Sequence, residues 1–482
     1  MNVVMAASEL APLVKTGGLG DVLGALPRAL KQTGVDVAVI LPAFAALKQS
    51  GREFEPTAWE ISVPVSSRVV QATVLHTELD GGVPLYCIDA DPYFDRPGLY
   101  GEGGSDYADN CERFVFFSRA VLEVLRRLGT PDLLHVHDWQ AALAPVFLRA
   151  DAGRYPDLAA VRTVMTVHNL GYQGRFWKHD WHLLNLDWRH FTFLGLEFYD
   201  DINFLKGGLL FADAITTVSP TYAREIQTPE HGYGLDGVLR QRAGVLTGIL
   251  NGVDYGEWDP RHDRHIAASY SSEDLTGKQQ CKAALQAAMG LHVDPDATLL
   301  GVVSRLAEQK GLDLLEQIVP RLLQRAVQLV VLGSGDSRLE AAFRALSAAH
   351  PGRMATRIEF DNRVAHQIEA GSDVFLMPSR YEPCGLNQMY SVRYGTVPVV
   401  RATGGLADSI VDVDEAPGYG TGFKFGPASG EALLQAIDRA FALKRDELEW
   451  RAVMKRGMQA DFSWARAALQ YRTLYDRITG SA

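Results

Sequence analysis

Cysteine is scarce in this chain of 482 residues: only Cys87, Cys111, Cys281 and Cys384 occur, and none belongs to a C-x-x-C pair. So few thiols are typical of a reducing compartment, and no Cys/His spacing predicts a zinc site. Basic charge is also in deficit, because 47 Lys and Arg stand against 58 Asp and Glu, a formal net charge of -11. A protein that holds nucleic acid or an anionic membrane by bulk charge should be basic, so both partners are disfavoured.

Long apolar runs are missing as well. No stretch approaches the ~20 apolar residues of a membrane-spanning helix. Residues 1–13 carry no basic region ahead of their apolar stretch, and Glu9 interrupts that stretch. This pattern argues against a signal peptide, so we expect a cytoplasmic protein.

The composition that remains, 47% hydrophobic and 22% charged, is that of a globular protein long enough for two domains. Short β-branched segments alternate with longer helical patterns. The predicted strands are residues 2–6, 35–41, 133–137, 163–167 and 214–218, then 299–303, 328–332, 373–377 and 397–400. The clearest predicted helices are residues 106–128, 312–325 and 338–349. Apolar strands alternating with helices are typical of parallel sheets covered on both faces, an α/β fold.

Two segments depart from that alternation. Residues 61–88 predict strands around a Gly81-Gly82 turn, which indicates an antiparallel excursion in the first half. A stretch of mixed charge with glycines and a proline follows a predicted strand at residues 245–250. We therefore expect a first domain of residues 1–250, a second of residues 251–460 and a C-terminal segment of residues 461–482.

The pattern T-G-G-L-x-D occurs once in each half, at residues 16–21 and 403–408. Each copy follows a predicted strand and opens a predicted helix. Paired glycines let the backbone approach a ligand and a helix start offers N–H groups, so the first copy, with Lys15, predicts a diphosphate site. A tight turn without a ligand is the alternative, but two identical copies favour function. Neither copy is a P-loop or a dinucleotide G-x-G-x-x-G motif.

Two cations follow the predicted strand at residues 299–303. Arg305 and Lys310 flank a turn into a helix, where they would neutralise a diphosphate leaving group. A solvated basic loop is the alternative, but the position of both cations at a strand end in an acidic protein favours function.

Polar side chains follow other predicted strands. Glu382, in E-P-C-G-L, is suited to ribose hydroxyls, although a helix-capping carboxylate is the alternative. Cys384 has no base placed beside it, so we expect it to be a packed residue. Asp138 with Trp139, and His168, each follow a strand in the first half and are suited to a sugar.

Two D-x-D patterns, Asp89 with Asp91 and Asp412 with Asp414, resemble the metal-holding aspartates of another class of sugar transferase. We expect both to be surface turns. Cations and helix ends already supply the charge that a diphosphate needs, so no metal or other cofactor is predicted.

Taken together, these strings resemble the bacterial glycogen synthase and plant starch synthase family almost end to end. Further matching strings are F-D-R-P-G at residues 94–98, T-V-H-N-L at 166–170, Y-Q-G at 172–174, K-G-G at 206–208, T-V-S-P at 217–220, N-G-V-D at 251–254 and W-D-P at 258–260. The resemblance implies the GT-B architecture, two Rossmann-like domains whose parallel sheets face each other across a deep cleft. It also implies that the last helix, residues 464–478, packs back on the first domain.

The resemblance also implies the reaction: retaining transfer of glucose from ADP-glucose to the non-reducing end of an α-1,4-glucan such as glycogen, releasing ADP. The first domain would hold the glucan and the glucose, and the second the sugar nucleotide, the halves closing around the substrates. The implied catalytic residues are Lys15, Asp138, His168, Arg305, Lys310 and Glu382. The implied sugar-nucleotide residues are Lys15, Gly17, Gly18, Asp21, Asn169, Cys384, Gly385, Leu386, Thr403, Gly404, Gly405 and Leu406. The implied acceptor residues are Tyr100, Trp139 and Asn251.

Two positions depart from the wider pattern. Tyr390 stands where many GT-B transferases carry a second Glu, as in the glycogen synthase branch, and Asn387 stands where Thr is usual. No carboxylate is obviously poised as a nucleophile, so a front-face reaction is predicted. The alternatives are another retaining GT-B transferase with a UDP-glucose donor or a small sugar acceptor, and an inactive glucan-binding regulatory protein. Oligomeric state stays open.

Overall fold

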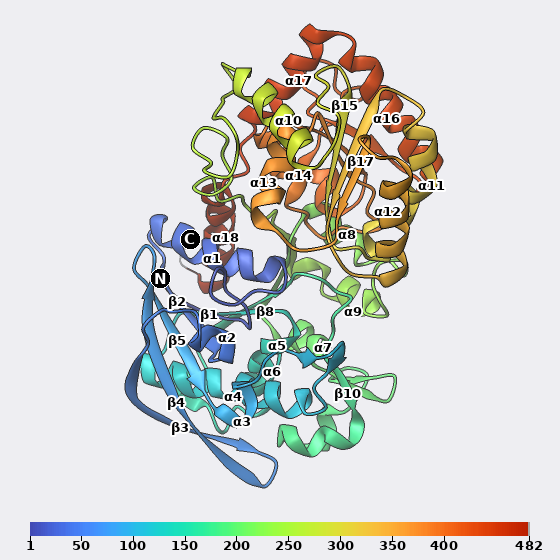
Figure 1. Cartoon of the computed structure of the whole chain (residues 1–482). Coiled ribbons are helices and arrows are strands. Elements are labelled where there is room, and N and C mark those ends of the chain that lie inside the picture. The colour runs from blue at the N-terminus through green and yellow to red at the C-terminus, as the bar shows by residue number, and fades with distance from the viewer. Residues whose placement is uncertain (481–482) are drawn as a thin grey trace. The chain divides into compact units, whose positions relative to one another are not determined.

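The computed structural model describes residues 1–480, and the chain divides into two compact units. The first unit contains Met1–Val218, Ala223–Gly252 and the C-terminal segment from Trp464, and the second contains Ser219–Tyr222 and Val253–Ser463. The chain therefore crosses from the first unit to the second and returns (Figure 1). The division at Gly252 lies two residues beyond the boundary expected from the sequence.

The first unit is built on a nine-stranded sheet of order β14-β13-β9-β8-β1-β2-β5-β4-β3. Its strands are β1 (Asn2–Ala6), β2 (Asp36–Pro42), β3 (Glu55–Val65), β4 (Arg68–Leu79), β5 (Val83–Asp89), β8 (Leu133–His137), β9 (Arg162–Val167), β13 (Ala214–Thr217) and β14 (Leu246–Gly248). All neighbours pair in parallel except β3 with β4 and β4 with β5. The predicted antiparallel excursion is therefore confirmed, and the strand predicted at residues 245–250 is shorter than expected.

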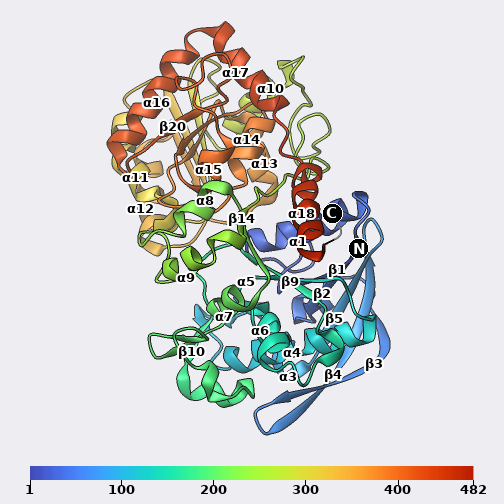
Figure 2. The same ribbon diagram turned by 180° about the vertical axis from the view of Figure 1, so that it is seen from behind.

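Helices cover both faces of this sheet, with α1 and α18 on one face and α4 and α6 on the other (Figures 1 and 2). The helices that follow its strands are α1 (Gly18–Gln32), α2 (Ala45–Lys48), α3 (Asp91–Phe94), α4 (Asn110–Leu128), α5 (Asp138–Ala141), α6 (Leu143–Ala150), α7 (Phe204–Phe211), α8 (Pro220–Glu225), α9 (Asp236–Gln241) and α18 (Trp464–Thr479). A hairpin joins β6 (Gly101–Glu102) to β7 (Ser105–Asp106), and a small sheet has the order β10 (Arg175–Trp177), β12 (Asp201–Asn203), β11 (Glu197–Phe198).

The second unit has an all-parallel sheet of order β17-β16-β15-β18-β19-β20. Its strands are β15 (Thr298–Val303), β16 (Val327–Leu332), β17 (Met354–Arg357), β18 (Val374–Met377), β19 (Val397–Arg401) and β20 (Phe423–Phe425). Its helices are α10 (Thr276–Ala288), α11 (Leu312–Leu322), α12 (Ser337–Ala349), α13 (Asn362–Gly371), α14 (Asn387–Arg393), α15 (Gly404–Ser409), α16 (Gly430–Lys444) and α17 (Glu447–Gln459). The predicted strands of this half are confirmed within one residue at each end.

Each sheet has a point at which the strand order reverses, at β1 in the first unit and between β15 and β18 in the second. Open α/β sheets bind ligands beyond the carboxyl ends of the strands at such points. The strands there are buried on both faces, which is why they form near-continuous apolar runs. The fold therefore predicts that a ligand binds at the segments that follow β1, β8, β15 and β18.

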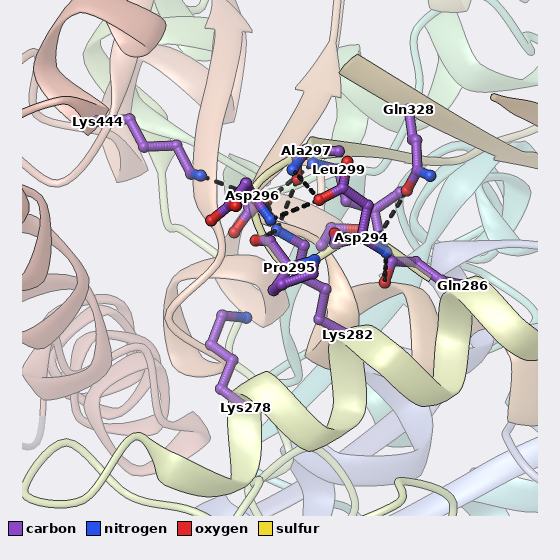
Figure 3. A network of polar contacts seen from close by, with 12 residues as sticks. Lys278, Lys282, Gln286, Asp294, Pro295, Asp296, Ala297, Leu299, Gln328 and Lys444 are labelled. Carbon is purple, nitrogen blue, oxygen red and sulfur yellow. Dashed lines mark hydrogen bonds and ion pairs between the residues drawn. The ribbon is translucent and has the colours of Figure 1, made fainter. Parts of the chain in front are cut away.

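At the amino-terminal ends of the central strands β15 and β18, a largely buried ion pair holds the second sheet (Figure 3). Lys282 of α10 donates to the carbonyls of Pro295 and Ala297 at 2.9 and 2.7 Å and to Asp373 Oδ2 at 2.8 Å. The same Asp373 oxygen accepts the amide of Leu299 at 2.8 Å. This network joins the amino-terminal ends of β15 and β18, so both strands enter the sheet in a set register.

Within the described residues, no helix is both long and apolar enough to cross a membrane.

Candidate active site

Asp138 and His168 lie together at the ends of β8 and β9. The Asp138 Oδ1 atom accepts the His168 amide at 2.7 Å, and His137 Nδ1 lies 3.1 Å from His168 Nε2. Asp138 has a φ of +55°, a conformation that costs free energy in a residue with a β-carbon and is concentrated at functional sites. The structure thus brings together two side chains that the sequence predicted for the sugar.

This group carries little charge at neutral pH. Burial raises the pKa of Asp138 to about 7, although the amides of His168 and Asn169 act in the opposite direction. Burial lowers the pKa of His168 to about 3, and that of His137 well below its ordinary value. Neutral imidazoles beside a carboxyl that titrates near pH 7 are suited to hydrogen bonding with hydroxyl groups, and not to neutralising a phosphate.

The first T-G-G-L copy has open space at its glycines. A β-carbon added at Gly17 or Gly18 would meet nothing within 4 Å, and α1 begins at Gly18 with no side-chain cap. The N–H groups of the first helical turn have no partner within a helix, so this end can receive an anion. Lys15 is exposed beside it and forms an ion pair of 2.6 Å with Asp21. The predicted diphosphate residues therefore do lie together.

Glu9 is a member of this group that the sequence analysis missed. Its carboxylate is 4% exposed and accepts the amide and the hydroxyl of Thr16 at 2.7 and 2.6 Å. It also accepts the Gly17 amide at 3.0 Å and the Tyr100 hydroxyl at 2.8 Å. A buried carboxylate has to be hydrogen-bonded, and an acidic residue in the apolar segment after β1 was the available signal. Glu9 holds the loop that carries Lys15.

The three predicted acceptor residues differ in their surroundings. The Tyr100 hydroxyl is engaged by Glu9 and lies 2.7 Å from Ser8 Oγ. The Trp139 ring packs against Phe114 with centroids 4.7 Å apart, so it has a packing role that the sequence analysis did not foresee. Asn251 is 5% exposed, and its Oδ1 atom has no hydrogen-bond partner among the described residues, which leaves a buried acceptor for a ligand.

In the second unit, the segments after β15 and β18 are joined by their backbones. The Arg380 amide donates to the Gln309 carbonyl at 2.8 Å. Gly311 has a φ of +64°, and a β-carbon there would lie 2.0 Å from the Pro378 carbonyl oxygen. Only glycine permits this approach. The turn that ends the S-R-L segment is therefore pressed against the segment that leads to Glu382.

This approach pairs Lys310 with Glu382. Lys310 Nζ lies 2.6 Å from Glu382 Oε2 and 2.9 Å from Oε1, and Ser379 Oγ donates to Oε2 at 2.9 Å. Glu382 is 5% exposed, so its charge is balanced inside the protein. Arg305 is exposed, and its guanidinium donates only a 3.4 Å bond to Gln309 Oε1 in the hydrogen bonds of the described residues. Of the two cations after β15, Arg305 is thus the one without an acidic neighbour in bonding distance.

The two positions that depart from the wider family pattern both have structural roles. Asn387, the first residue of α14, donates from Nδ2 to the Val303 carbonyl at 2.7 Å and so ties the E-P-C-G-L segment to the end of β15. The Tyr390 ring stacks on Trp258 with centroids 3.9 Å apart and an interplanar angle of 2°. Gly385 turns into α14 with a φ of +69°, and Leu386 lies partly exposed beside it, while Cys384 is buried.

The second T-G-G-L copy differs from the first in what surrounds it. A β-carbon at Gly404 would lie 1.9 Å from the Glu382 carbonyl oxygen, and one at Gly405 would lie 2.0 Å from that of Cys384. The Gly405 amide donates to Glu382 O at 3.1 Å, and the Leu406 amide to Thr403 O at 3.1 Å. In this structure these two amides are bonded to protein carbonyls. This copy therefore packs under the Glu382 segment, and the binding of a phosphate by Thr403–Leu406 stays a prediction.

The two D-x-D patterns pair with protein cations. Asp89 and Asp91 each lie 2.7 Å from Lys48 Nζ. Asp412 accepts a 2.7 Å bond from Arg439 and the Lys424 amide and is 2% exposed, so the predicted surface position was wrong for Asp412. Asp414 lies exposed in a turn, as predicted. Among the residues that the structure describes, no group of three or more His, Cys, Asp or Glu side chains is arranged to hold a metal ion.

Comparisons with known proteins show the family of this chain. Residues 2–241 match the family model of the starch synthase catalytic domain, and residues 291–456 match glycosyl transferases group 1. The glycogen synthase of Anaeromyxobacter dehalogenans (strain 2CP-1 / ATCC BAA-258) is 51% identical, with 98% of each chain covered. That of Koribacter versatilis (strain Ellin345) is 49% identical, over 99% of this chain and 98% of the relative. The chain belongs to the glycogen synthase family.

Two solved structures of other transferases have the same fold as this member of the glycogen synthase family. The catalytic domain of starch synthase IV from Arabidopsis thaliana, bound to ADP and acarbose, has a TM-score of 0.90 and 33% identity, with 99% of both chains covered. A sucrose-phosphate synthase from Thermosynechococcus elongatus, at 18% identity and a TM-score of 0.63, shares the fold alone. The predicted GT-B fold class and the assignment to glycosyltransferases are confirmed.

Proposed function

We propose that this member of the glycogen synthase family transfers glucose from ADP-glucose to the non-reducing end of an α-1,4-glucan, releases ADP and retains the α configuration. The proposal rests on one observation: two groups of residues at strand ends differ in their charge. Asp138 and His168 form an almost uncharged, hydroxyl-binding group, whereas Arg305 and Lys310 supply positive charge for a diphosphate. The ADP bound by the Arabidopsis starch synthase supports ADP as the product nucleotide.

Lys15, Arg305 and Lys310 neutralise the charge that grows on the diphosphate as its bond to the sugar breaks. Lys15 and Lys310 are each ion-paired with a carboxylate, so they exchange part of that partnership for the phosphates when donor binds. Preorganised donors of this kind each contribute about 2.7–4 kcal/mol in a transition state. These cations do the work that a divalent metal does in other transferases, so we propose that no metal is needed.

Transfer proceeds on the face that the diphosphate leaves. A double displacement needs a carboxylate nucleophile on the opposite face. Glu382 is neutralised by Lys310 and Ser379, and Asp138 is engaged by the His168 amide, so neither oxygen pair is poised for attack. The bond from the sugar carbon to the diphosphate breaks, the glucan hydroxyl oxygen bonds to that carbon, and its proton passes to a departing phosphate oxygen. Nearby backbone carbonyls steady the short-lived oxocarbenium-like ion.

We further propose a cytoplasmic location. All four cysteines are buried and free of disulfides, which supports a reducing compartment.

The deciding experiment mixes the protein with ADP-glucose or UDP-glucose, with and without glycogen, and measures release of the nucleoside diphosphate. We expect glycogen-dependent release of ADP and new α-1,4 linkages in the product. A preference for UDP-glucose, or for a small sugar acceptor, would replace this proposal by another GT-B transferase. Release in neither case, with glycogen still bound, would support the inactive glucan-binding protein.

A rapid quench with a slow fluorinated donor, followed by intact-protein mass spectrometry, tests the mechanism separately. We expect no glucosyl adduct. A stable adduct on Asp138 or Glu382 would establish double displacement.

A further inference from the structure

Three histidine rings form a row in the first sheet: His135 and His137 lie on β8, and His168 comes directly after β9. The His137 ring lies between the other two, with its centroid 4.1 Å from that of His135 and 5.3 Å from that of His168. His135 and His137 are fully buried, whereas His168 is partly exposed. His137 therefore connects the core of the sheet to a residue that is predicted to bind the sugar.

His135 and His137 differ in their hydrogen bonds. His135 has a partner at each ring nitrogen, the Tyr475 hydroxyl 2.7 Å from Nδ1 and Thr166 Oγ1 2.5 Å from Nε2. His137 has one partner, His168 Nε2, which lies 3.1 Å from its Nδ1 atom. Its Nε2 atom is buried without a hydrogen-bond partner among the described residues. The one hydrogen bond of the His137 side chain is thus made to a residue of the candidate active site.

The proton in the bond between His137 and His168 can be assigned from this arrangement. Burial lowers the pKa of His137 well below its ordinary value and that of His168 to about 3, so both rings are neutral and each carries one N–H. A proton on His137 Nε2 would be a buried donor without an acceptor, which is rarer in proteins than an acceptor left bare. The His137 proton therefore lies on Nδ1 and is donated to His168 Nε2. His168 then carries its own proton on Nδ1.

The Nδ1 atom of His168 is the ring nitrogen that can meet a ligand. Among the described residues, His168 donates its amide to Asp138 and meets His137 with Nε2, and no hydrogen bond engages Nδ1. The Asp138 carboxylate only accepts hydrogen bonds when it is ionised. Because a sugar hydroxyl both donates and accepts, a donor at His168 complements the acceptor at Asp138. A bare Nδ1 would leave two acceptors and no donor at this position.

We propose that His137 is a positioning residue: it donates Nδ1–H to His168 Nε2 and so fixes His168 as the Nδ1–H tautomer, which donates to an oxygen of the transferred sugar. This inference rests on the proposed function and adds to it the residue that orients His168. The hydrogen bond made by one ring nitrogen of a histidine decides which nitrogen carries the proton, and the wrong tautomer presents a lone pair where a donor is needed. The proposal also accounts for a buried ring with one unpaired nitrogen at a position where an apolar ring would lack that cost.

The tautomer of His168 can be measured without substrate and without activity. The full chain is produced with histidine labelled with 15N in the ring, and His168→Gln identifies the His168 signals by their loss. Protonated and bare nitrogens of a neutral imidazole differ strongly in 15N chemical shift. We expect a protonated Nδ1 and a bare Nε2 for His168 at neutral pH. A protonated Nε2 in the wild type would overturn the proposal, whatever the activity.

The variant His137→Phe keeps a flat ring in the row but removes both nitrogens. We expect the His168 signals to show a mixture of tautomers and kcat/KM for ADP-glucose, with glycogen as acceptor, to fall by about tenfold, the effect of one lost hydrogen bond. His137→Asn, whose side-chain N–H can take the place of Nδ1–H, should restore the Nδ1–H tautomer and most of the activity. The control is His76→Phe on β4 of the same sheet, where His76 contacts the Tyr86 ring, and it should match the wild type.

A purely structural role for His137 gives a different result. A lower thermal midpoint in His137→Phe, with the His168 tautomer and kcat/KM per folded molecule unchanged, would make His137 a packing residue and overturn the proposal. A loss of activity with the His168 tautomer unchanged would also overturn it. If the wild type transferred no glucose but His137→Phe still changed the tautomer of His168, the proposed function would fail and the positioning of His168 by His137 would stand.

Discussion

The two lysines assigned to the diphosphate are held by ion pairs of unequal burial. The Lys15–Asp21 pair is open to solvent, with 40% and 27% of the two side chains exposed, whereas the Lys310–Glu382 pair has 19% and 6% exposed. Exposed pairs contribute about 0–1 kcal/mol to stability, but removal of one partner of a buried pair leaves an uncompensated charge. A Lys15 variant should therefore lose activity through the lost charge alone, whereas a Lys310 variant should also lose stability. Variants at both positions have to be assayed for folding as well as for activity.

Arg305→Ala should reduce turnover by about 10²–10³-fold, because it removes one charged donor from the transition state. The free energy of unfolding should hardly change, since Arg305 is exposed and bonded only to Gln309. Lys310→Ala should lose turnover and also about 3–5 kcal/mol of stability, because Glu382 is left buried and unpaired. ADP release and urea unfolding measure the two effects, with Arg344→Ala, in an exposed pair with Glu340, as control. Near wild-type turnover in Arg305→Ala would refute its role.

The raised pKa of Asp138, about 7, predicts a pH dependence for catalysis. If the carboxylate accepts sugar hydroxyls, kcat/KM should fall as pH decreases through about 7, with a slope of one proton. Asp138→Asn should be nearly inactive and should lack this limb. The pH profile of kcat/KM from pH 5.5 to 9 is the measurement. A flat profile in the wild type would mean that the protonated form serves equally well.

Two segments with the same sequence can have different surroundings, as the two T-G-G-L segments show. The first begins a helix of 15 residues and leaves open space at its glycines. The second begins a helix of six residues and is packed against the carbonyls of Glu382 and Cys384. Glycine permits close approach both to a ligand and to backbone, so the sequence alone does not predict which surroundings a glycine pair has.

The buried pair between Lys282 and Asp373 allows a test of stability without loss of chemistry. Asp373→Ala should destabilise the second unit by about 3–5 kcal/mol, because it leaves the Lys282 ammonium buried without its carboxylate. The pair lies at the amino-terminal strand ends, away from Arg305, so KM and kcat per folded molecule should be unchanged. Urea unfolding is the measurement, with Arg451→Ala in an exposed helical pair as a control that should cost under about 0.5 kcal/mol. Altered KM in Asp373→Ala would contradict this separation.

At the scale of the whole molecule, the chain returns to the first unit after completing the second. Helix α18 lies beside α1 in Figures 1 and 2, and Tyr475 on it is fully buried and lies 2.7 Å from Nδ1 of His135 in β8. The fold of the first unit is therefore complete only when residues 340 positions apart in the sequence are in contact. Its stability depends on both ends of the chain.

Tyr475→Phe should destabilise the first unit by about 1–3 kcal/mol, because it leaves the buried His135 ring nitrogen without its partner. Thr473→Ala on the exposed side of the same helix should have little effect. Hydrogen exchange of the β8 amides reports on the first unit directly. Equal protection of β8 in both variants would mean that the hydroxyl contributes nothing measurable.

The strands, the antiparallel excursion and the α/β class could be predicted from the sequence. Hydrophobic periodicity and the positions of glycines determine strands and turns within a few residues. The order of the site motifs along the chain was accessible for the same reason, since each follows a strand. The predicted helix at residues 106–128 begins only at Asn110 because the residues before it form the β6–β7 hairpin and a turn. The start of a helix therefore depends on the segment that precedes it as well as on hydrophobic periodicity.

Only the tertiary structure decided which polar groups meet. Glu9 reaches Thr16, Gly17 and Tyr100 because the segment after β1 folds back on itself beside the β6–β7 hairpin. Lys310 reaches Glu382, 72 positions along the chain, because Gly311 admits the Pro378 carbonyl. Short-range pattern determines where strands and helices form, whereas a pairing between distant residues depends on how those elements pack, and no local spacing in the sequence records it.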